Sequence, residues 1–456
     1  MKLKVHNPAT GQVAATLPAD DAKSVRAKYE RARAAQPGWA KVRLKQRLAA
    51  MQRFRELVAN EAELLARVLT TEVGKPISQS RNELKGVLPR LDFFLEETAH
   101  ALRTRKVHAD DAMEERISHE PLGVVANISA WNYPWFVGSN VFVPALLAGN
   151  TVLYKPSEFA SLTGAEITRL LYTAGIPQDA FIPVIGGAKA GEALLEQPVD
   201  GVFFTGSLAT GKRIAESVAG RMIKLQLELG GKDPIYVCED VDIATAAASV
   251  ADGAFYNAGQ SCCSVERIYV HQGAFDAFVD AFLGAVRKFR SGDPTEDATY
   301  IGPLARGAQV KVLEAQVRDA VKKGAKVLAG GKRAKGKGHW FEPTVLVNVD
   351  HSMAVMREES FGPIIGIMAA KDDAEAVRLM NDTNYGLTAG IYTRDRQRAE
   401  KVLAQLRSGS VYWNCCDRVS PRLPWSGVGD SGLGLTLSTY GIEAFTRPKA
   451  WHLRSP

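Results

Sequence analysis

Residues 123–128 have the sequence G-V-V-A-N-I, a short apolar run that begins at a glycine and is rich in β-branched residues. Similar runs recur at residues 151–154, 181–185 and 201–204, and segments of helical character separate them. Short runs of this kind predict buried strands, and their alternation with helices is typical of βαβ units. We therefore expect an α/β fold in which helices cover both faces of a parallel sheet.

The pattern extends in both directions from this stretch. Upstream, residues 41–73 carry apolar side chains at helical spacing and end at Gly74-Lys75-Pro76, which predicts amphipathic helices packed on a core. Downstream of residue 228 a second α/β series begins. It comprises a helix at residues 243–256 and strands at residues 267–270 and 362–368. We expect two α/β units with a boundary near residue 232.

The size and composition of the chain fit a protein of two domains. Its 456 residues are too many for one hydrophobic core, and 46% of them are hydrophobic. No stretch approaches the roughly 20 apolar residues that span a bilayer. Residues 1–8 lack the apolar core of a signal peptide. We therefore expect a cytoplasmic protein without a membrane partner.

Charge and metal-binding residue types argue against two other functional classes. The net charge is +7, but the basic cluster at residues 332–337 lacks the interleaved aromatic residues of a nucleic-acid surface. The eight histidines include no HExxH motif, and the five cysteines form neither a CxxC pattern nor a disulfide framework. We expect no nucleic-acid partner and no metal site.

Three segments carry side chains that together could oxidise an aldehyde. Cys262, in G-Q-S-C-C, is a candidate nucleophile, because a thiolate attacks carbonyl carbons. Glu228 ends an alternating strand pattern just before two glycines and could activate water. Asn132, in W-N-Y-P, offers an amide that could hydrogen-bond an oxyanion. A thiol, a carboxylate and an amide donor are the groups needed to form and hydrolyse a thioester.

These segments resemble the aldehyde dehydrogenase superfamily in its NAD(P)-dependent, non-acylating form. Eight motifs occur in the family's order and at its approximate spacing, nearly from end to end of the chain. They are A-W-N-Y-P at 130–134, K-P-S-E at 155–158, F-T-G-S at 204–207, E-L-G-G-K at 228–232, G-Q-S-C at 259–262, E-E-S-F-G-P at 358–363, N-Y-G-L at 384–387 and P-W-S-G at 424–427. The chain is broadly similar to succinate-semialdehyde and betaine or amino-aldehyde dehydrogenases.

The resemblance implies two Rossmann-like parallel-sheet domains plus a small β arm for oligomerisation. It assigns residues 1–102 and 122–232 to a cofactor-binding domain, residues 233–430 to a catalytic domain, and residues 103–121 and 431–456 to the arm and C-terminal tail. It also implies a homodimer or homotetramer.

The resemblance implies a role for each candidate catalytic residue. Cys262 forms the thiohemiacetal and thioester, and Asn132 stabilises the oxyanion with the backbone N–H of Cys262. Glu228 activates water to release a free carboxylic acid, since members that transfer the acyl group to coenzyme A typically lack this acid. Lys155 is placed with the catalytic and the cofactor residues.

The resemblance assigns a nicotinamide dinucleotide to the first unit. Glu158 should accept hydrogen bonds from the adenosine ribose and repel a 2′-phosphate, so we expect NAD⁺ in preference to NADP⁺. The assigned cofactor residues are Ile128, Trp131, Asn132, Lys155, Ser157, Glu158, Gly187, Thr205, Gly206, Ser207, Gly211, Glu228, Leu229, Gly230, Cys262, Glu359 and Phe361.

Residues 206–213 invite a second interpretation, because they follow a strand and nearly match the phosphate-binding motif GxxxxGK[ST]. Arg213 replaces the hydroxyl residue that would hold Mg²⁺ in an ATPase. A dinucleotide pyrophosphate at the N-terminus of the following helix fits this segment better.

The substrate is less well determined by the sequence. Asn140 occupies the position where succinate-semialdehyde members often carry an arginine, which argues against a carboxylate-bearing substrate. Tyr133, Trp135 and Trp425 are the expected pocket residues, and aromatic faces suit a cationic amine or an apolar aldehyde. Arg418 and Arg422, in the segment before Trp425, could still attract an anion. A semialdehyde, an amino-aldehyde and an aromatic aldehyde all remain open.

A catalytically silent binding protein and a thiol esterase are the two alternatives to an aldehyde dehydrogenase. A catalytically silent binding protein should have lost a reacting residue, yet Asn132, Glu228, Cys262 and Glu359 are all present. A thiol esterase would need no cofactor, which would leave the segment at 206–211 and Glu158 without a role.

Overall fold

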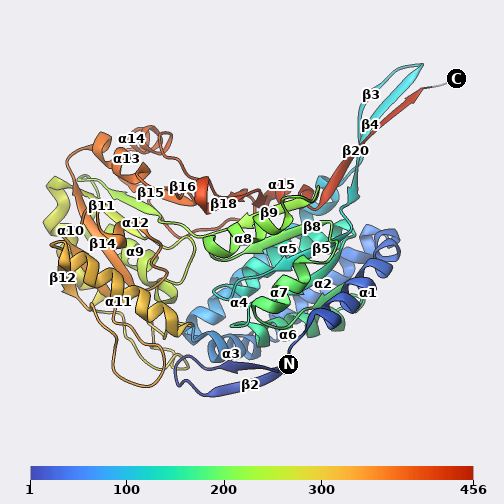
Figure 1. Ribbon diagram of the computed structural model, residues 1–456. Helices are drawn as coiled ribbons and strands as arrows, with labels where there is room; N and C mark the ends of the chain where they lie inside the picture. Colours follow the sequence, from blue (N-terminus) through green and yellow to red (C-terminus); the bar gives the residue numbers. More distant parts are fainter. Residues whose placement is uncertain (1, 455–456) are drawn as a thin grey trace.

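The computed structural model describes residues 2–454 and contains two large, mainly parallel sheets with helices packed around them (Figure 1). The first sheet has the strand order β18-β9-β8-β5-β6-β7. Its strands are β5 (Val124–Ile128), β6 (Thr151–Lys155), β7 (Phe181–Pro183), β8 (Gly201–Thr205), β9 (Lys224–Glu228) and the antiparallel β18 (Gly432–Leu433). The strands expected from residue 123 onward are therefore confirmed.

Helices cover both faces of the first sheet because its strands are apolar on both sides. The side chains of Val125 and Val152 pack in one cluster, whereas those of Val124 and Leu153 pack in another. Helices α2 (Leu44–Asn60), α3 (Ala62–Val73), α4 (Ile77–Ala101), α5 (Pro134–Ala148) and α6 (Ser161–Thr173) contribute to the first cluster, and α1 (Ala22–Lys41), α7 (Ala188–Leu195) and α8 (Leu208–Val218) to the second. Gly74, at φ 81°, ends α3 where the sequence predicted a helix stop.

The second sheet has the strand order β12-β13-β14-β11-β10-β15-β16, and all neighbours are parallel except β12 and β13. Its strands are β10 (Pro234–Val237), β11 (Arg267–His271), β12 (Lys326–Ala329), β13 (Thr344–Val347), β14 (Ile364–Ala370), β15 (Thr388–Tyr392) and β16 (Ser410–Trp413). The helices of this part are α9 (Ile243–Phe255), α10 (Phe275–Val286), α11 (Gly307–Lys322), α12 (Ala354–Arg357), α13 (Asp373–Asn381) and α14 (Arg396–Leu403), with short 3₁₀ turns η1 (Tyr256–Gly259) and η2 (Gln272–Ala274).

A three-stranded arm projects from the body at one end (Figure 1). It consists of β3 (Arg105–Ala109), β4 (Met113–Pro121) and β20 (Thr446–Arg454), in the order β20-β4-β3. The excursion at 103–121 and residues 446–454 of the expected C-terminal tail thus form one small sheet, while residues 455–456 lie outside the described part. The first part of that tail lies elsewhere, because β18 at residues 432–433 joins the first large sheet. The two parallel sheets and this extra sheet confirm the predicted fold class.

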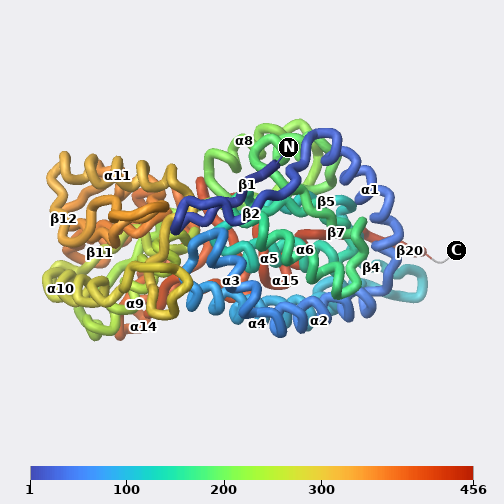
Figure 2. The backbone as a smooth tube through the Cα atoms, turned by 90° about the horizontal axis from the view of Figure 1, so that it is seen from below, coloured from blue at the N-terminus to red at the C-terminus, as the bar shows by residue number. Residues whose placement is uncertain are grey.

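Smaller elements join the two halves. The hairpin of β1 (Lys2–His6) and β2 (Val13–Pro18) lies across the underside and reaches the second half (Figure 2). There, the backbone N–H of His339 donates to the carbonyl of Pro8 over 3.0 Å. The remaining elements are β17 (Trp425–Ser426), β19 (Leu435–Thr436), η3 (Gly429–Ser431) and α15 (Ser438–Glu443). No helix within residues 2–454 is both long and apolar enough to cross a membrane.

Candidate active site

Cys262 lies on a tight loop between α9 and β11 whose shape depends on unusual backbone angles. Asn257 and Ala258 both have φ 54°, and Gly259 follows at φ 69°. A Cβ atom at Gly259 would lie 2.4 Å from the carbonyl oxygen of Gly362, so only glycine fits there. The loop leaves the side chain of Cys262 partly exposed, whereas Cys263 is buried.

Asn132 is fixed to this loop by a hydrogen bond. Its Nδ2 donates to the carbonyl oxygen of Gln260 over 3.2 Å, and Asn257 Nδ2 donates to the same oxygen over 3.2 Å. A side-chain amide carries two N–H groups, so the second one on Asn132 is available to another acceptor. Pro134 starts α5 immediately afterwards and holds the turn. Two motifs that are 130 residues apart in the sequence therefore meet.

Glu228 is buried at the carboxyl end of β9, where two side chains orient its carboxylate. Trp425 Nε1 donates to Oε1 over 2.8 Å, and Thr205 Oγ1 donates to Oε2 over 3.4 Å. Burial raises the pKa of Glu228, although both donors and the positive charge of Arg90 act in the opposite direction. A carboxyl group whose pKa moves toward neutrality is suited to proton transfer.

The thiol of Cys262 is held in its protonated form in the isolated chain. A hydrogen bond from Cys263 lowers the pKa of Cys262, but burial and the negative charges of Glu228, Asp233 and Asp417 together raise it above its usual range. Cys263 Sγ in turn donates to Asp417 Oδ1 over 2.9 Å. The nucleophile therefore needs a base or a nearby positive charge before it can attack.

A cleft of about 640 Å³ opens where the strand order of the first sheet reverses, between β5 and β8. Ligands of doubly wound sheets bind at this point, outside the carboxyl ends of the strands. Ile128 ends β5, Lys155 ends β6 and Thr205 ends β8, and all three line the cleft. The other predicted cofactor residues that line it are Trp131, Ser157, Glu158, Gly206 and Ser207.

The residues of the cleft fit a dinucleotide. Ser207 is the N-cap of the eleven-residue helix α8, whose free N–H groups can hold a pyrophosphate. Lys155 Nζ has only the Pro156 carbonyl within reach, at 3.3 Å, and no carboxylate within 4 Å among residues 2–454. Burial lowers the pKa of Lys155, with Glu158 acting against it. The helix N-terminus suits the pyrophosphate of a dinucleotide. The buried cation of Lys155 and the carboxylate of Glu158 suit the adjoining ribose.

The remaining predicted cofactor residues do not line this cleft. Phe361 contacts Trp131 edge to face, with ring centroids 5.6 Å apart. Glu359 Oε1 accepts the N–H of Gly231 at 3.2 Å, and its burial raises its pKa to about 8. Of the residues outside the cleft lining, Gly187 is the N-cap of α7, Gly211 packs against Leu229, Gly230 lies against Glu359, and Asn132, Glu228 and Cys262 form the group described above.

The predicted substrate residues occupy different environments. Trp425 is buried and bound to Glu228, and Tyr133 is partly exposed beside Asn132. Trp135 is only 1% exposed and lies in the hydrophobic core, with its backbone N–H donating to Glu83. Phe136, which the sequence analysis did not single out, is partly exposed and stacks on Tyr133 with centroids 5.7 Å apart. The arginines at 418 and 422 are exposed.

Several residues near the site carry no recognisable sequence pattern. Arg306 lines the cofactor cleft and lies 5.8 Å from the ring of Phe159. Asp417, itself at φ 50°, lies beside Cys263, and burial raises the pKa of Asp417 to about 6. Arg90 belongs to the middle of α4, where nothing local distinguishes it from a surface arginine. Only the folded chain shows that these side chains meet the motif residues.

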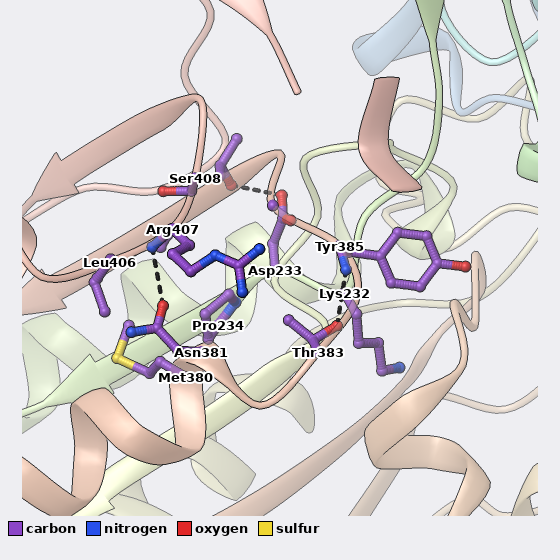
Figure 3. A pocket seen from close by; sticks show the side chains of 13 residues that line it. Lys232, Asp233, Pro234, Met380, Asn381, Thr383, Tyr385, Leu406, Arg407 and Ser408 are labelled. Carbon is purple, nitrogen blue, oxygen red and sulfur yellow. Dashed lines mark hydrogen bonds between the residues drawn. The ribbon is translucent and has the colours of Figure 1, made fainter. Parts of the chain in front are cut away.

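A separate pocket lies at the start of β10 and β15 (Figure 3). Asp233 is buried there and accepts a hydrogen bond from Thr388 Oγ1 over 2.6 Å, and Asn381 Oδ1 accepts the backbone N–H of Arg407 over 2.9 Å. At about 10 Å³ it has room for about one water molecule. It includes none of the predicted catalytic residues. Within residues 2–454 no group of three or more histidines, cysteines or acids is arranged to hold a metal ion.

A doubly wound sheet with a cleft at its switch point, next to a cysteine on a strained loop, defines a dehydrogenase-type α/β protein. A family model described as "Aldehyde dehydrogenase family" matches residues 1–451, and the chain belongs to this family. The motifs predicted this membership.

Individual relatives agree with it. The chain is 35% identical over 455 residues to a glutarate-semialdehyde dehydrogenase of Pseudomonas putida, covering 98% of this chain and 93% of the relative. It is 34% identical over 444 residues to a succinate-semialdehyde dehydrogenase [NADP(+)] of Deinococcus radiodurans, covering 97% and 93%. The crystal structure of an NAD-dependent aldehyde dehydrogenase from Sinorhizobium meliloti superposes with a TM-score of 0.96 at 34% identity, covering 100% of this chain and 91% of that one.

Proposed function

We propose that the protein oxidises an aldehyde to the carboxylic acid with NAD(P)⁺, through a covalent intermediate on Cys262. The hydrogen bond between Asn132 Nδ2 and the Gln260 carbonyl supports this most directly, because it brings an oxyanion donor to the loop of the nucleophile. Glu228, oriented by Trp425, supplies a buried carboxylate for the hydrolytic step.

The side chains of the protein account for the bond changes. Cys262 Sγ passes its proton to Glu228, which releases it to solvent, and bonds to the aldehyde carbon, while Asn132 and the backbone N–H of Cys262 hold the oxygen that becomes negative. Bound NAD(P)⁺ supplies the hydride acceptor that turns the thiohemiacetal into a thioester. Glu228 then removes a proton from a water molecule, and the oxygen of that water bonds to the thioester carbon. The C–S bond breaks and releases the acid and the thiolate.

Cofactor choice follows from the charges that line the cleft. Glu158 lies there beside Lys155, and a carboxylate at the ribose repels a 2′-phosphate. We therefore expect a higher kcat/KM with NAD⁺ than with NADP⁺. Glu158→Gln should narrow this difference, because it removes the negative charge and keeps a hydrogen-bonding group. An unchanged ratio of the two kcat/KM values would contradict the assignment of Glu158.

The central test follows absorbance of the reduced cofactor with a panel of semialdehydes, amino-aldehydes, aliphatic and aromatic aldehydes. The unaltered protein should turn over at least one class and yield the carboxylic acid, identified by mass spectrometry. Cys262→Ala should bind the cofactor and produce no reduced cofactor. Absence of turnover across the panel with both cofactors, or full activity of Cys262→Ala, would overturn the proposal.

We also propose the division into a cofactor-binding domain (1–102 and 122–232), a catalytic domain (233–430), and an arm with tail (103–121 and 431–456) through which subunits pair. The separate arm sheet and the two parallel sheets support this division. We also place the enzyme in the cytoplasm. The nucleophile Cys262 is followed by a second thiol, Cys263, and both stay reduced in that compartment.

A further inference from the structure

Arg90 is a buried arginine on α4 with most of its hydrogen-bonding capacity unused. Its side chain is about 5% exposed, and its guanidinium carbon lies 4.2 Å from the centroid of the Phe136 ring. Nη1 donates to Asn140 Oδ1 over 3.0 Å. Nε and Nη2 have no protein partner within residues 2–454, yet they are not among the polar atoms that the protein seals off completely. They therefore face space that a water or a ligand can enter.

The charge of Arg90 is not compensated by a direct ion pair. No carboxylate among residues 2–454 lies within 4 Å of its guanidinium, whereas buried Lys75 pairs with Glu83 and buried Lys232 with Glu266. Arg267, also buried, donates to three backbone carbonyls instead. A buried guanidinium with free N–H groups and no acid partner is a strong binding site for an anion.

Two stacked aromatic rings connect Arg90 to the segment that carries the oxyanion donor. Phe136, beneath its guanidinium, stacks on Tyr133, and Tyr133 adjoins the oxyanion donor Asn132. No residue of α4 or α5 lines the cofactor cleft, so Arg90 and Phe136 lie outside the site expected to bind the dinucleotide. Burial lowers the pKa of Arg90 to about 10, and the negative charges of Glu228, the two adjacent cysteines and Glu83 act against that shift. Arg90 is thus close enough to interact electrostatically with the catalytic groups.

We propose that Arg90 binds a carboxylate at the far end of the substrate, so that the enzyme acts on ω-oxo acids. This inference rests on the proposed aldehyde oxidation. Asn140 is a positioning residue, because its amide oxygen accepts from Nη1 and thereby fixes the orientation of the other N–H groups. The absence of arginine at position 140 therefore does not exclude an acidic substrate, since α4 supplies the cation and Asn140 orients it.

The first experiment compares ω-oxo acids of four, five and six carbons with unbranched neutral aldehydes of the same length. In the unaltered enzyme at least one acid should have a kcat/KM ten or more times that of its neutral partner. Arg90→Met should lower kcat/KM for the acids about 10- to 100-fold, as expected for a charge-assisted hydrogen bond, mainly through KM. Neutral aldehydes should change less than threefold at a pH above the acid limb, where the effect of Arg90 on the pKa of Glu228 no longer alters the rate.

Matched variants separate binding from a general electrostatic role. Arg55→Met removes an arginine that pairs with Asp92 on the outer side of α4, and it should leave the acid preference unchanged. Asn140→Ala keeps the charge but loses the orienting oxygen, so KM for the acids should rise several-fold. It also provides a test if Arg90→Met folds poorly. Equal losses for acidic and neutral aldehydes in both variants would show that Arg90 only tunes Glu228 or Cys262, and would overturn the proposal.

A second experiment measures binding of an anion near Cys262 without requiring turnover. Iodoacetamide should alkylate the partly exposed Cys262 in the cofactor-free enzyme. Glutarate, a dicarboxylate, should slow that reaction, as measured by mass spectrometry of the Cys262 peptide. Arg90→Met should raise the half-protecting glutarate concentration at least tenfold. If protection depends on Arg90 but no aldehyde is oxidised, the anion site stands and the proposed reaction fails. If neutral and acidic aldehydes are oxidised equally well and glutarate gives no protection, the reaction stands and the anion site fails.

Discussion

At the scale of single residues, Glu228 and Cys262 influence each other's protonation. Each is buried enough for its pKa to lie above the usual value, and the negative charge of Glu228 contributes to the raised pKa of Cys262. A protonated Glu228 cannot remove a proton from water, and a protonated Cys262 cannot attack. Both effects predict an enzyme that loses activity as the pH falls.

Removing a donor to Glu228 should move the acid limb of the pH profile. Trp425→Phe deletes the N–H that lies 2.8 Å from Oε1 and stabilises the ionised form. The pKa of Glu228 should therefore rise further, and the acid limb of kcat should shift to higher pH. Thr205→Val, which removes a weaker 3.4 Å hydrogen bond, should produce a smaller shift in the same direction. Profiles of kcat against pH for the three proteins provide the measurement, and a limb that stays in place or moves downward argues against Glu228 as the base.

Neutralising the base should separate the two halves of the reaction. Glu228→Gln keeps the size of the side chain and loses its basicity, so steady-state turnover should fall about 10²- to 10⁴-fold. Thioester formation should continue, and a stopped-flow trace should show a burst of about one reduced cofactor per active site followed by slow release. A linear trace without a burst, at normal turnover, would assign hydrolysis to another group.

The motif residues could be predicted because each stands in a turn whose backbone needs particular neighbours. Gly259 fits where no Cβ can, and Pro134 starts a helix, so these residues accompany Cys262 and Asn132 in the sequence. Arg90 lies in the middle of α4, directly after Pro89, and no motif around it indicates a binding role. Its role depends on how α4 packs against α5, which is decided by contacts between distant parts of the chain.

At the scale of elements, α6 is capped by a side chain from another helix. Its own N-cap, Ala160, makes no side-chain hydrogen bond. Glu72, near the end of α3, instead accepts the N–H groups of Leu162 and Thr163 over 2.8 and 2.6 Å. Burial raises the pKa of Glu72 to about 7. The cap thus joins α3 to the helix that follows the cofactor residues Ser157 and Glu158.

Changes at Glu72 should alter both stability and its dependence on pH. Glu72→Ala leaves two buried N–H groups without an acceptor and should lower the free energy of unfolding by about 1–3 kcal/mol per group. Because the folded-state pKa exceeds the ordinary value of 4.5, the folded chain holds a proton that the unfolded chain has lost between about pH 4.5 and 7. The free energy of unfolding should decrease as the pH rises across that window. Glu72→Gln should make this decrease smaller. Urea titrations at several pH values test both effects, and a decline that Glu72→Gln leaves unchanged would point to other groups.

Strand prediction succeeded where the local pattern was strong and failed where pairing depends on distant partners. The apolar runs behind β5, β6 and β8 are buried on both faces, and this burial explains their composition. β18 has only two residues and no propensity signal, and its place is set by Leu229 N–H donating to the Ser431 carbonyl at 3.0 Å.

At the scale of the whole molecule, the arm exposes strand edges and apolar side chains. β20 and β3 are the outer strands of the arm sheet, and Val107 and Leu453 on them are 55% and 40% exposed. Outer strands with free N–H and carbonyl groups readily pair with another chain. This supports the proposal that subunits associate through the arm.

If subunits associate through the arm, light scattering of the unaltered protein should give at least twice the mass of one chain. Val107→Asp combined with Leu453→Asp should reduce the mass toward a monomer, because two charges would have to be buried in the interface. Circular dichroism should remain unchanged, since these side chains lie outside the three core clusters. A monomer mass for the unaltered protein would rule out the arm as a pairing element.

The pairing of β18 with β9, with Gly432 opposite Glu228, has a consequence for protein synthesis. A ribosome that adds about 5–20 residues per second delivers β18 roughly 10–40 s after β9 has emerged. During that interval the edge of β9, which carries Glu228, has no strand paired with it. Chaperone occupancy should therefore peak while the second half is being translated. A transcript cut short before codon 432 would yield a polypeptide that holds every reacting side chain and still cannot finish the sheet that carries them.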